Sequence, residues 1–284
     1  MKKTGTREWS DVSINCCLGC ANACVYCYAR QMALRAGRIR SGRDWAKERP
    51  RSLEEIARRP EYGRKHRGVV MLPTSHDVTP GNREACLAVL GRLLAAGNRV
   101  LLVTKPRLEI MADVGALYQG RLVNWAVCGL GLGDCIGPRL EVRCSITCLD
   151  DDIRREWEPA APEIQERIEV LRYLRGEGIA TSVAIEPNLQ PDRVDRLVEI
   201  VDPLVSGTIW VGKLNKMAER LKWALDPQEG LCLDDRATLS KAADWLEAQQ
   251  TDRKVMEVVE QLRGNAKIRW KDSYAEVVER SDGN

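Results

Sequence analysis

The sequence predicts an α/β protein whose parallel strands form a complete or partial barrel. Short apolar runs, such as residues 68–72 and 99–104, have the composition of strands that are buried on both faces. Segments with a helical pattern, such as residues 82–96, separate these runs. Strands that alternate with helices are usually parallel strands joined by crossovers. With 284 residues, of which 44% are hydrophobic, the chain can bury a substantial core.

The predicted elements follow one another in a regular order. The strands are expected at residues 9–18, 68–72, 99–104, 140–147, 180–185 and 208–211. The helices are expected at residues 28–36, 52–59, 82–96, 107–118, 150–176, 191–201, 217–225, 236–249 and 252–262. The segment 150–176 contains Pro159 and Pro162, which break a helix because proline lacks a backbone N–H. Residues 266–271 are a late strand or an extended tail.

Two domains are expected from this order. Residues 1–215 hold six strand–helix units and form the barrel, and residues 216–284 form a C-terminal helical extension that caps it. A Gly-rich loop that contains Cys128 and Cys135 precedes the fourth predicted strand. These two cysteines and Cys232 are spaced too irregularly to favour an auxiliary cluster.

Composition narrows the class of protein. No apolar signal stretch follows the first residues, and no apolar run is long enough to span a bilayer, so no membrane association is expected. We therefore expect a cytoplasmic, reducing compartment, where clustered cysteines more often bind metal than form disulfides. The net charge of +3 is too small to demonstrate a nucleic-acid partner.

The most informative motif is a group of closely spaced cysteines. Five of the eleven cysteines lie within twelve residues, and Cys20, Cys24 and Cys27 have the spacing C-x3-C-x2-C. Disulfide geometry is too narrow for thiols packed this closely to pair without strain. Thiolates favour iron–sulfur clusters, zinc or cuprous copper. Three thiolates on a four-iron cluster would leave one iron open for chemistry, by analogy with catalytic zinc sites.

Two simpler metal sites are alternatives. Cys17 and Cys20 with Cys24 and Cys27 form two C-x2-C pairs, which can hold zinc. Zinc modules, however, usually separate their pairs by roughly 12–20 residues. A ferredoxin-type electron-transfer loop has the order C-x2-C-x2-C-x3-C, which differs from the spacing here.

The motif resembles the signature loop of the radical S-adenosylmethionine (SAM) enzymes. Tyr26 before the third cysteine, and Tyr28-Ala29-Arg30 after it, are similar to the spore photoproduct lyase and "DNA repair photolyase" branch. The resemblance implies a 4Fe–4S cluster on Cys20, Cys24 and Cys27, whose fourth iron chelates SAM. It also implies the partial barrel typical of this superfamily. Reductive cleavage of SAM would yield a 5′-deoxyadenosyl radical that abstracts hydrogen, with electrons from a donor such as flavodoxin or ferredoxin.

The resemblance extends to residues at the ends of the predicted strands. The stretch Ser145-Ile146-Thr147-Cys148-Leu149-Asp150 and the following Glu158-Pro159 resemble a corresponding stretch of that branch, which implies that Ser145 contacts SAM. The loop with Ser75 and Asp77 resembles the one that binds the amine of SAM. By the same resemblance, Arg175 reaches the SAM carboxylate. Glu186 ends the fifth predicted strand, where a carboxylate can hydrogen-bond the ribose hydroxyls.

Two cysteines near the fourth predicted strand are candidates for a hydrogen-atom donor. The lyase uses a cysteine in this region to donate hydrogen to the product radical, and Cys144 or Cys148 can serve that role here. Positions four apart face the same side of a regular strand. The alternative is that both thiols are small buried apolar groups.

A basic segment after the motif bears on the substrate. Residues 35–67 carry twelve arginines and lysines, which can neutralise phosphates, and the interleaved Trp45 and Tyr62 can stack on bases. The alternative is a solvated loop. A nucleic-acid or nucleotide substrate is therefore our first hypothesis, with lyase-like repair or modification as the reaction. The alternatives are radical modification of a peptide or small metabolite, and a non-catalytic zinc or ferredoxin-like module that binds nucleic acid.

Overall fold

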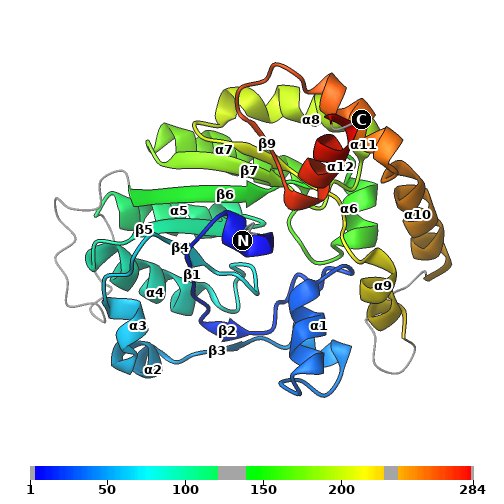
Figure 1. Ribbon diagram of the computed structural model, residues 1–284. Helices are drawn as coiled ribbons and strands as arrows, with labels where there is room; N and C mark the ends of the chain where they lie inside the picture. The colour runs from blue at the N-terminus through cyan, green and yellow to red at the C-terminus, as the bar shows by residue number, and fades with distance from the viewer. Residues whose placement is uncertain (1–3, 121–138, 227–235, 283–284) are drawn as a thin grey trace.

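A seven-stranded parallel sheet forms the centre of the protein (Figure 1). The computed structural model describes residues 4–120, 139–226 and 236–282. The strands of the sheet, in spatial order, are β1 (Val12–Ser13), β4 (Val69–Leu72), β5 (Arg99–Thr104), β6 (Leu140–Ser145), β7 (Ala180–Ile185), β8 (Ile209–Val211) and β9 (Ile268–Trp270). Each neighbouring pair is parallel. This curled sheet with crossover helices is a partial α/β barrel, so the predicted fold class is confirmed.

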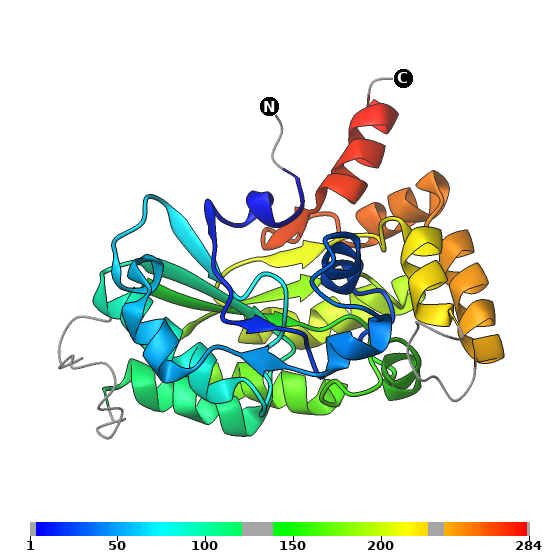
Figure 2. The same ribbon diagram turned by 90° about the horizontal axis from the view of Figure 1, so that it is seen from below.

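The crossover helices lie along one face of the sheet (Figure 2). They are α4 (Arg83–Ala95), α5 (Leu108–Tyr118), α6 (Asp151–Trp157), α7 (Ile164–Gly176) and α8 (Val194–Val201). Alternate strand residues divide between the two faces because successive side chains point in opposite directions. Val100 and Val142 belong to the main core beneath the helices, whereas Met71 and Leu101 pack with Trp9 in a separate cluster. The break between α6 and α7 contains Pro159 and Pro162, as predicted.

The expected first strand is shorter than predicted. Residues 9–18 divide into β1 and β2 (Cys17–Leu18), and β2 pairs antiparallel with β3 (Arg49–Pro50). Asn15 lies between them, and its side chain binds the loop after β4. Its Oδ1 accepts from the backbone N–H groups of Thr74 and Ser75 at 2.8 and 2.9 Å. These contacts replace sheet pairing, and the chain leaves the sheet there.

The basic segment follows α1 (Tyr28–Arg35) and folds as a series of short elements. They are the 3₁₀ turn η2 (Gly42–Ala46), β3, α2 (Leu53–Arg58) and α3 (Pro60–Gly63). Another 3₁₀ turn, η1 (Gly5–Glu8), precedes β1, and two more, η4 (Pro191–Arg193) and η5 (Asp202–Leu204), flank α8.

The C-terminal region supplies helices and the last strand of the sheet. The helices are α9 (Met217–Leu225), α10 (Arg236–Gln249), α11 (Asp252–Gln261) and α12 (Asp272–Asp282). The late strand expected at residues 266–271 is β9, which pairs parallel with β8. The Gly-rich loop with Cys128 and Cys135, and also Cys232, lie outside the described residues. Among the residues that are described, no helix has the length and apolarity needed to cross a bilayer.

Candidate active site

The carboxyl ends of the parallel strands meet at one edge of the sheet, where barrel proteins carry their chemistry. The chain that leaves β1 and β2 forms the cluster loop (residues 19–27), which contains the three motif cysteines. Asp77 follows β4, Lys105 follows β5, and Ser145 ends β6. Glu186 directly follows β7. The topology therefore brings five sequence-distant segments to one edge.

Backbone geometry fixes where the cluster loop begins. Gly19 has a φ of +102°, in the region that favours glycine. A Cβ at this position would lie 2.7 Å from the carbonyl oxygen of Trp45 and 2.8 Å from that of Lys47. The next residue, Cys20, donates its N–H to the Trp45 carbonyl at 2.8 Å. Glycine is therefore required for the loop to lie this close to η2.

Two acidic side chains hold the first half of the cluster loop. Glu48 accepts hydrogen bonds from the Ala21 N–H at 2.9 Å and from the Thr79 hydroxyl at 2.7 Å. Asp77 accepts from the Asn22 side chain at 3.0 Å. The loop is thus bound both to the basic segment and to the loop after β4. Nothing in the sequence near Glu48, which lies among arginines, indicates this role.

Arg30 of α1 holds the second half of the loop. It is 1% exposed, and its Nη2 donates to the carbonyl of Val25 at 2.6 Å. Its Nη1 donates to the carbonyl of Cys24 at 3.5 Å. The backbone N–H of Arg30 donates to the Cys27 sulfur at 3.4 Å, so Cys27 caps the N-terminus of α1. The cysteine motif and the start of α1 are therefore one structural unit.

The motif thiols lie in a poorly solvated environment. Burial raises the pKa of Cys24 to about 12 and also raises that of Cys20. The carboxylate of Asp77 adds to the effect on both thiols, whereas the Lys105 ammonium lowers the pKa of Cys24. The Asp77 N–H donates to the Cys20 sulfur at 3.4 Å. Without a metal, these two thiols are protonated at neutral pH.

The spacing of these thiols suits a group larger than one ion. Within the described part of the chain, three metal-ligand atoms lie within 4.8 Å of one another in one group, which is Cys16, His76 and Cys86. At least one pair among the sulfurs of Cys20, Cys24 and Cys27 is therefore more than 4.8 Å apart. One zinc ion with bonds of about 2.3 Å can join ligands no more than about 4.6 Å apart. The three cysteines, all free thiols, thus fit a polynuclear iron–sulfur cluster better than the zinc site considered above.

Asp77 and Lys105 form a buried ion pair beside the loop. Asp77 Oδ2 lies 3.5 Å from the Lys105 ammonium, and Oδ1 accepts from the Lys105 backbone N–H at 2.8 Å. Burial alone would raise the pKa of Asp77, but Lys105 and these hydrogen bonds lower it. Burial would lower the pKa of Lys105, but the carboxylates of Asp77 and Glu158 help to raise it well above its usual value. Both groups are charged at neutral pH.

Glu158 links the loop to the helix layer. This side chain is fully buried, and its Oε2 lies 2.6 Å from Nη2 of Arg167, which is also fully buried. Its Oε1 accepts from the Thr147 hydroxyl at 2.9 Å and from the hydroxyl of Tyr26. Burial would raise the pKa of Glu158, but Arg167 and Lys105 lower it. Tyr26 belongs to the cluster loop, so this carboxylate connects that loop to Arg167 of α7.

Ser145, Ser75 and Glu186 lie at the same edge. Ser145 is partly exposed, and it pairs with Ala184 of β7 in the register of the sheet. Ser75 donates its backbone N–H to Asn15. Glu186 Oε2 lies 3.7 Å from the ammonium of Lys271, which follows β9. Burial raises the pKa of Glu186 to about 7, although Lys271 opposes the shift.

A cation that the sequence analysis did not single out lies near the cysteine loop. Arg220 of α9 donates to the carbonyl of Tyr26 at 3.4 Å, and its Nε is buried without a hydrogen-bond partner. Burial lowers the pKa of Arg220, and the charges of Cys27 and Glu186 raise it. Arg175, by contrast, is an exposed residue at the end of α7, just before β7 begins. That position is at the opposite edge of the sheet, so the structure does not bring Arg175 to the site.

The two candidate hydrogen donors lie in different surroundings. Cys144 occupies the face of β6 that packs against the helices, in the main core, whereas its neighbour Ser145 lies on the alternate face. Burial raises the pKa of Cys144 well above its usual value. Cys148 follows the strand and donates to the Asp150 carbonyl at 3.3 Å, and burial raises its pKa to about 12. Both are protonated thiols, and their role as hydrogen donors stays a prediction.

The basic segment exposes its cations and buries its aromatic side chains. Trp45 and Tyr62 are each only 2% exposed, so the expectation that they stack on bases was wrong. They pack in the core, where their large apolar area is removed from water. The exposed cations of the segment are Arg35, Arg38, Arg40, Arg43, Lys47, Arg49, Arg58, Arg64, Lys65 and Arg67.

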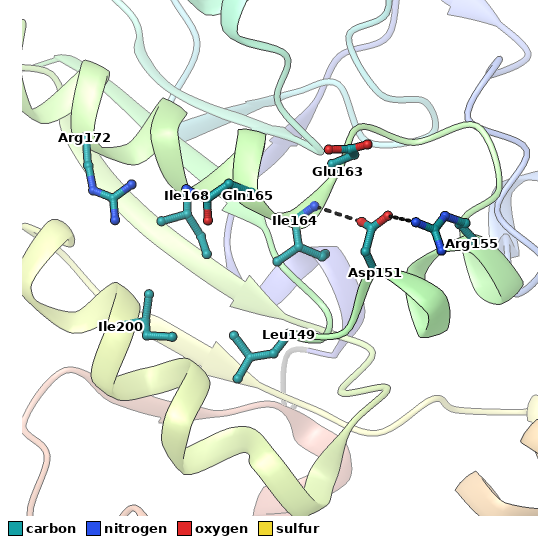
Figure 3. A pocket seen from close by; sticks show the side chains of 9 residues that line it. All are labelled: Leu149, Asp151, Arg155, Glu163, Ile164, Gln165, Ile168, Arg172 and Ile200. Carbon is teal, nitrogen blue, oxygen red and sulfur yellow. Dashed lines mark hydrogen bonds and ion pairs between the residues drawn. The ribbon is translucent and has the colours of Figure 1, made fainter.

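A cavity of about 460 Å³ lies between α6, α7 and α8 (Figure 3). Leu149, Ile168 and Ile200 form its apolar side, and Asp151 accepts from the N–H of Ile164 at 3.2 Å. None of the predicted site residues lines it.

Comparisons with known proteins agree with this architecture. No family model matches the sequence. Uncharacterized protein ORF301 of Acidianus two-tailed virus is 26% identical over 196 residues, or 66% of this chain. The match spans 60% of the length of the viral protein.

Solved structures of spore photoproduct lyase share the fold. A cysteine-to-alanine mutant with dinucleoside spore photoproduct has a TM-score of 0.58 and 16% identity, and covers 95% of this chain and 79% of that chain. Spore photoproduct lyase complexed with dinucleoside spore photoproduct has a TM-score of 0.56, 16% identity and the same coverage. The fold implied by the cysteine motif is therefore confirmed.

Proposed function

We propose that this chain is a radical SAM enzyme with a 4Fe–4S cluster on Cys20, Cys24 and Cys27. One observation carries the proposal: three buried or half-buried free thiols occupy one loop at the carboxyl edge of a parallel partial barrel. When bound, such a cluster and SAM supply a 5′-deoxyadenosyl radical that abstracts hydrogen from a substrate.

The surrounding residues would bind and orient SAM. Ser145 and Glu186 lie at the ends of β6 and β7, and we infer that they contact the sulfonium-bearing chain and the ribose hydroxyls. Ser75 and Asp77 follow β4, where the backbone can accept from the SAM amine. Arg220, rather than the exposed Arg175, is suited to the SAM carboxylate because its guanidinium lies at the cluster loop, where it donates to the carbonyl of Tyr26.

A nucleic acid or nucleotide is the substrate that the surface favours. Exposed arginines such as Arg38, Arg40 and Arg43 follow α1, which begins at the last cysteine of the cluster loop. Phosphate contacts from such side chains supply most non-specific nucleic-acid affinity. The likeness to spore photoproduct lyase complexed with dinucleoside spore photoproduct supports a lyase-like repair or modification. Cys144 or Cys148 would then return a hydrogen atom to the product radical.

The test is anaerobic reconstitution with iron and sulfide, followed by dithionite and SAM. Formation of 5′-deoxyadenosine, measured by chromatography, is the expected result. Single-stranded DNA, duplex DNA, RNA and a peptide are then added separately. SAM labelled with deuterium is used, and mass spectrometry shows whether the deuterium enters the added molecule. Stimulation by a peptide alone would replace the nucleic-acid hypothesis by peptide modification. A bound, reduced cluster that yields no 5′-deoxyadenosine with any of these would refute the enzyme assignment.

A further inference from the structure

A second group of metal-ligand atoms lies behind the cluster loop. Cys16 lies in the chain between β1 and β2, His76 in the loop after β4, and Cys86 in α4. Their sulfur and ring-nitrogen atoms all lie within 4.8 Å of one another. The three residues are 1%, 7% and 2% exposed, respectively. Three separate segments thus bring these ligand atoms to one buried position that the proposed function does not use.

The distance between the two sulfurs matches a pair of metal ligands. Cys16 Sγ and Cys86 Sγ are 3.4 Å apart. A disulfide would require about 2.05 Å. Two ligands with zinc–sulfur bonds of about 2.3 Å at the tetrahedral angle are about 3.8 Å apart. A change of a few tenths of an ångström would therefore give the two sulfurs the separation of zinc ligands, whereas a disulfide would require a much larger movement.

The histidine has the tautomer that a metal ligand needs. His76 Nδ1 lies 3.0 Å from the backbone carbonyl oxygen of Asp77, which places the ring proton on that nitrogen. Metal-ligating histidines commonly donate their second ring N–H to a backbone carbonyl in this way. Nε2 keeps its lone pair toward the two cysteines. It now accepts from the N–H groups of Cys16 and Cys17 at 3.4 and 3.2 Å, contacts that a metal bond would replace.

Charge balance selects the metal. Two thiolates and one neutral imidazole carry a charge of −2, which Zn²⁺ neutralises, whereas Cu⁺ would leave a buried negative charge. Zinc also accepts mixed sulfur and nitrogen ligands in a tetrahedral arrangement. A side-chain oxygen lies close enough to be considered as the fourth zinc ligand, because Asn82 Oδ1 is 3.2 Å from Cys86 Sγ.

We propose that Cys16, His76 and Cys86 bind one structural zinc ion, with the Asn82 side-chain oxygen as the fourth ligand. The ion joins the segment that leads into the cluster loop to α4 and to the loop after β4. His76 is followed by Asp77, which hydrogen-bonds Cys20 and Asn22 of the cluster loop. The zinc would therefore act as a positioning site that holds the base of the cluster loop.

The experiment uses the full chain with Cys20, Cys24 and Cys27 replaced together by serine, so that the cluster site cannot hold zinc. After purification and dialysis against a weak chelator, mass spectrometry of the metal content should give one zinc per chain. Adding Cys86→Ala should abolish that zinc. Cys144→Ala is the matched control, since Cys144 is equally buried in the same core, and it should retain the metal.

Cobalt substitution keeps the test independent of whether Cys86→Ala folds. Co²⁺ in the triple-serine protein should give strong thiolate charge-transfer absorption with the visible bands of a tetrahedral site. A weak octahedral spectrum, absence of stoichiometric zinc, or a Cys16–Cys86 disulfide formed in its place would overturn the proposal. The site is independent of the proposed function: zinc here with no 5′-deoxyadenosine from the wild type would refute only the enzyme assignment.

Discussion

The charge on Glu158 should contribute more to stability than any exposed ion pair of the chain that the structure describes. Glu158 and Arg167 are both fully buried, and their closest atoms are 2.6 Å apart. Glu158→Gln keeps the shape of the side chain but leaves the Arg167 guanidinium in the core without a counter-charge. Removing one partner of a buried pair typically costs about 3–5 kcal/mol. We expect a loss of that size in the free energy of unfolding.

The assay is urea unfolding of the metal-free protein under reducing conditions, followed by circular dichroism. Glu54→Gln is the matched control, because Glu54 forms an exposed i,i+4 pair with Arg58 and such pairs contribute about 0.3–0.5 kcal/mol. In Glu158→Gln combined with Arg167→Met, the two effects should be strongly non-additive, since the second change removes the uncompensated charge. A Glu158→Gln loss no larger than that of Glu54→Gln would refute the reasoning, as would additivity in the double variant.

The same carboxylate should make stability depend on pH in a defined direction. The folded-state pKa of Glu158 lies below its ordinary value of 4.5 because Arg167 and Lys105 outweigh the opposing effect of burial. Its stabilising contribution is therefore complete above pH 4.5 and is lost as the pH falls through the folded-state pKa. The wild type should lose stability in that acidic window, and Glu158→Gln should lose less. Equal acid sensitivity of the two proteins would contradict this.

Three further perturbations test the site. Gly19→Ala should destabilise the protein by more than the roughly 1–2 kcal/mol that left-handed backbone costs an alanine, because its Cβ would also meet the Trp45 carbonyl oxygen at 2.7 Å. Gly178→Ala, with a φ of +72° and open space around it, is the control and should show the backbone cost alone; equal losses would contradict the close approach. Cys24→Ala should remove the brown colour and 5′-deoxyadenosine formation after reconstitution, and retention of both would exclude this loop as the cluster site. Burial raises the folded-state pKa of Glu186 from 4.5 to about 7, so between these pH values the folded state keeps a proton that the unfolded state has lost. The free energy of unfolding should therefore fall as the pH rises through this range. The same dependence of stability on pH in Glu186→Gln would refute the shift.

The strands were predictable where their signal is local. The apolar run at residues 99–104 is β5, and the run at residues 180–185 is β7, because a strand covered on both faces needs no partner to be recognised. The break after β1 was not predictable. It depends on the hydrogen bonds that the Asn15 side-chain oxygen accepts from the N–H groups of Thr74 and Ser75, which lie about sixty residues further along the chain. A pattern of alternating apolar residues contains no information about such distant contacts.

The candidate site divides in the same way. The cysteine spacing is local, and Asp77 and Glu186 follow recognisable strands, so their common edge could be inferred from the parallel topology. Glu48 and Arg220 were missed because they reach the loop only through tertiary contacts. Glu48 directly precedes the two-residue strand β3, which the sequence did not predict, and Arg220 lies within α9, so neither residue follows a predicted strand of the barrel.

The charges around the cluster loop explain why its geometry must be set by the protein in advance. Cys20 and Cys24 are buried near the carboxylates of Asp77 and Glu158, and both thiols have raised pKa values in the absence of metal. Metal binding must therefore displace protons from buried thiols, which makes assembly of the cluster less favourable at neutral pH. Lys105 offsets part of this cost, since its ammonium group favours the thiolate of Cys24. The hydrogen bonds from Arg30 to the loop carbonyls offset more of it, because a loop already held in position loses little conformational entropy when the metal binds.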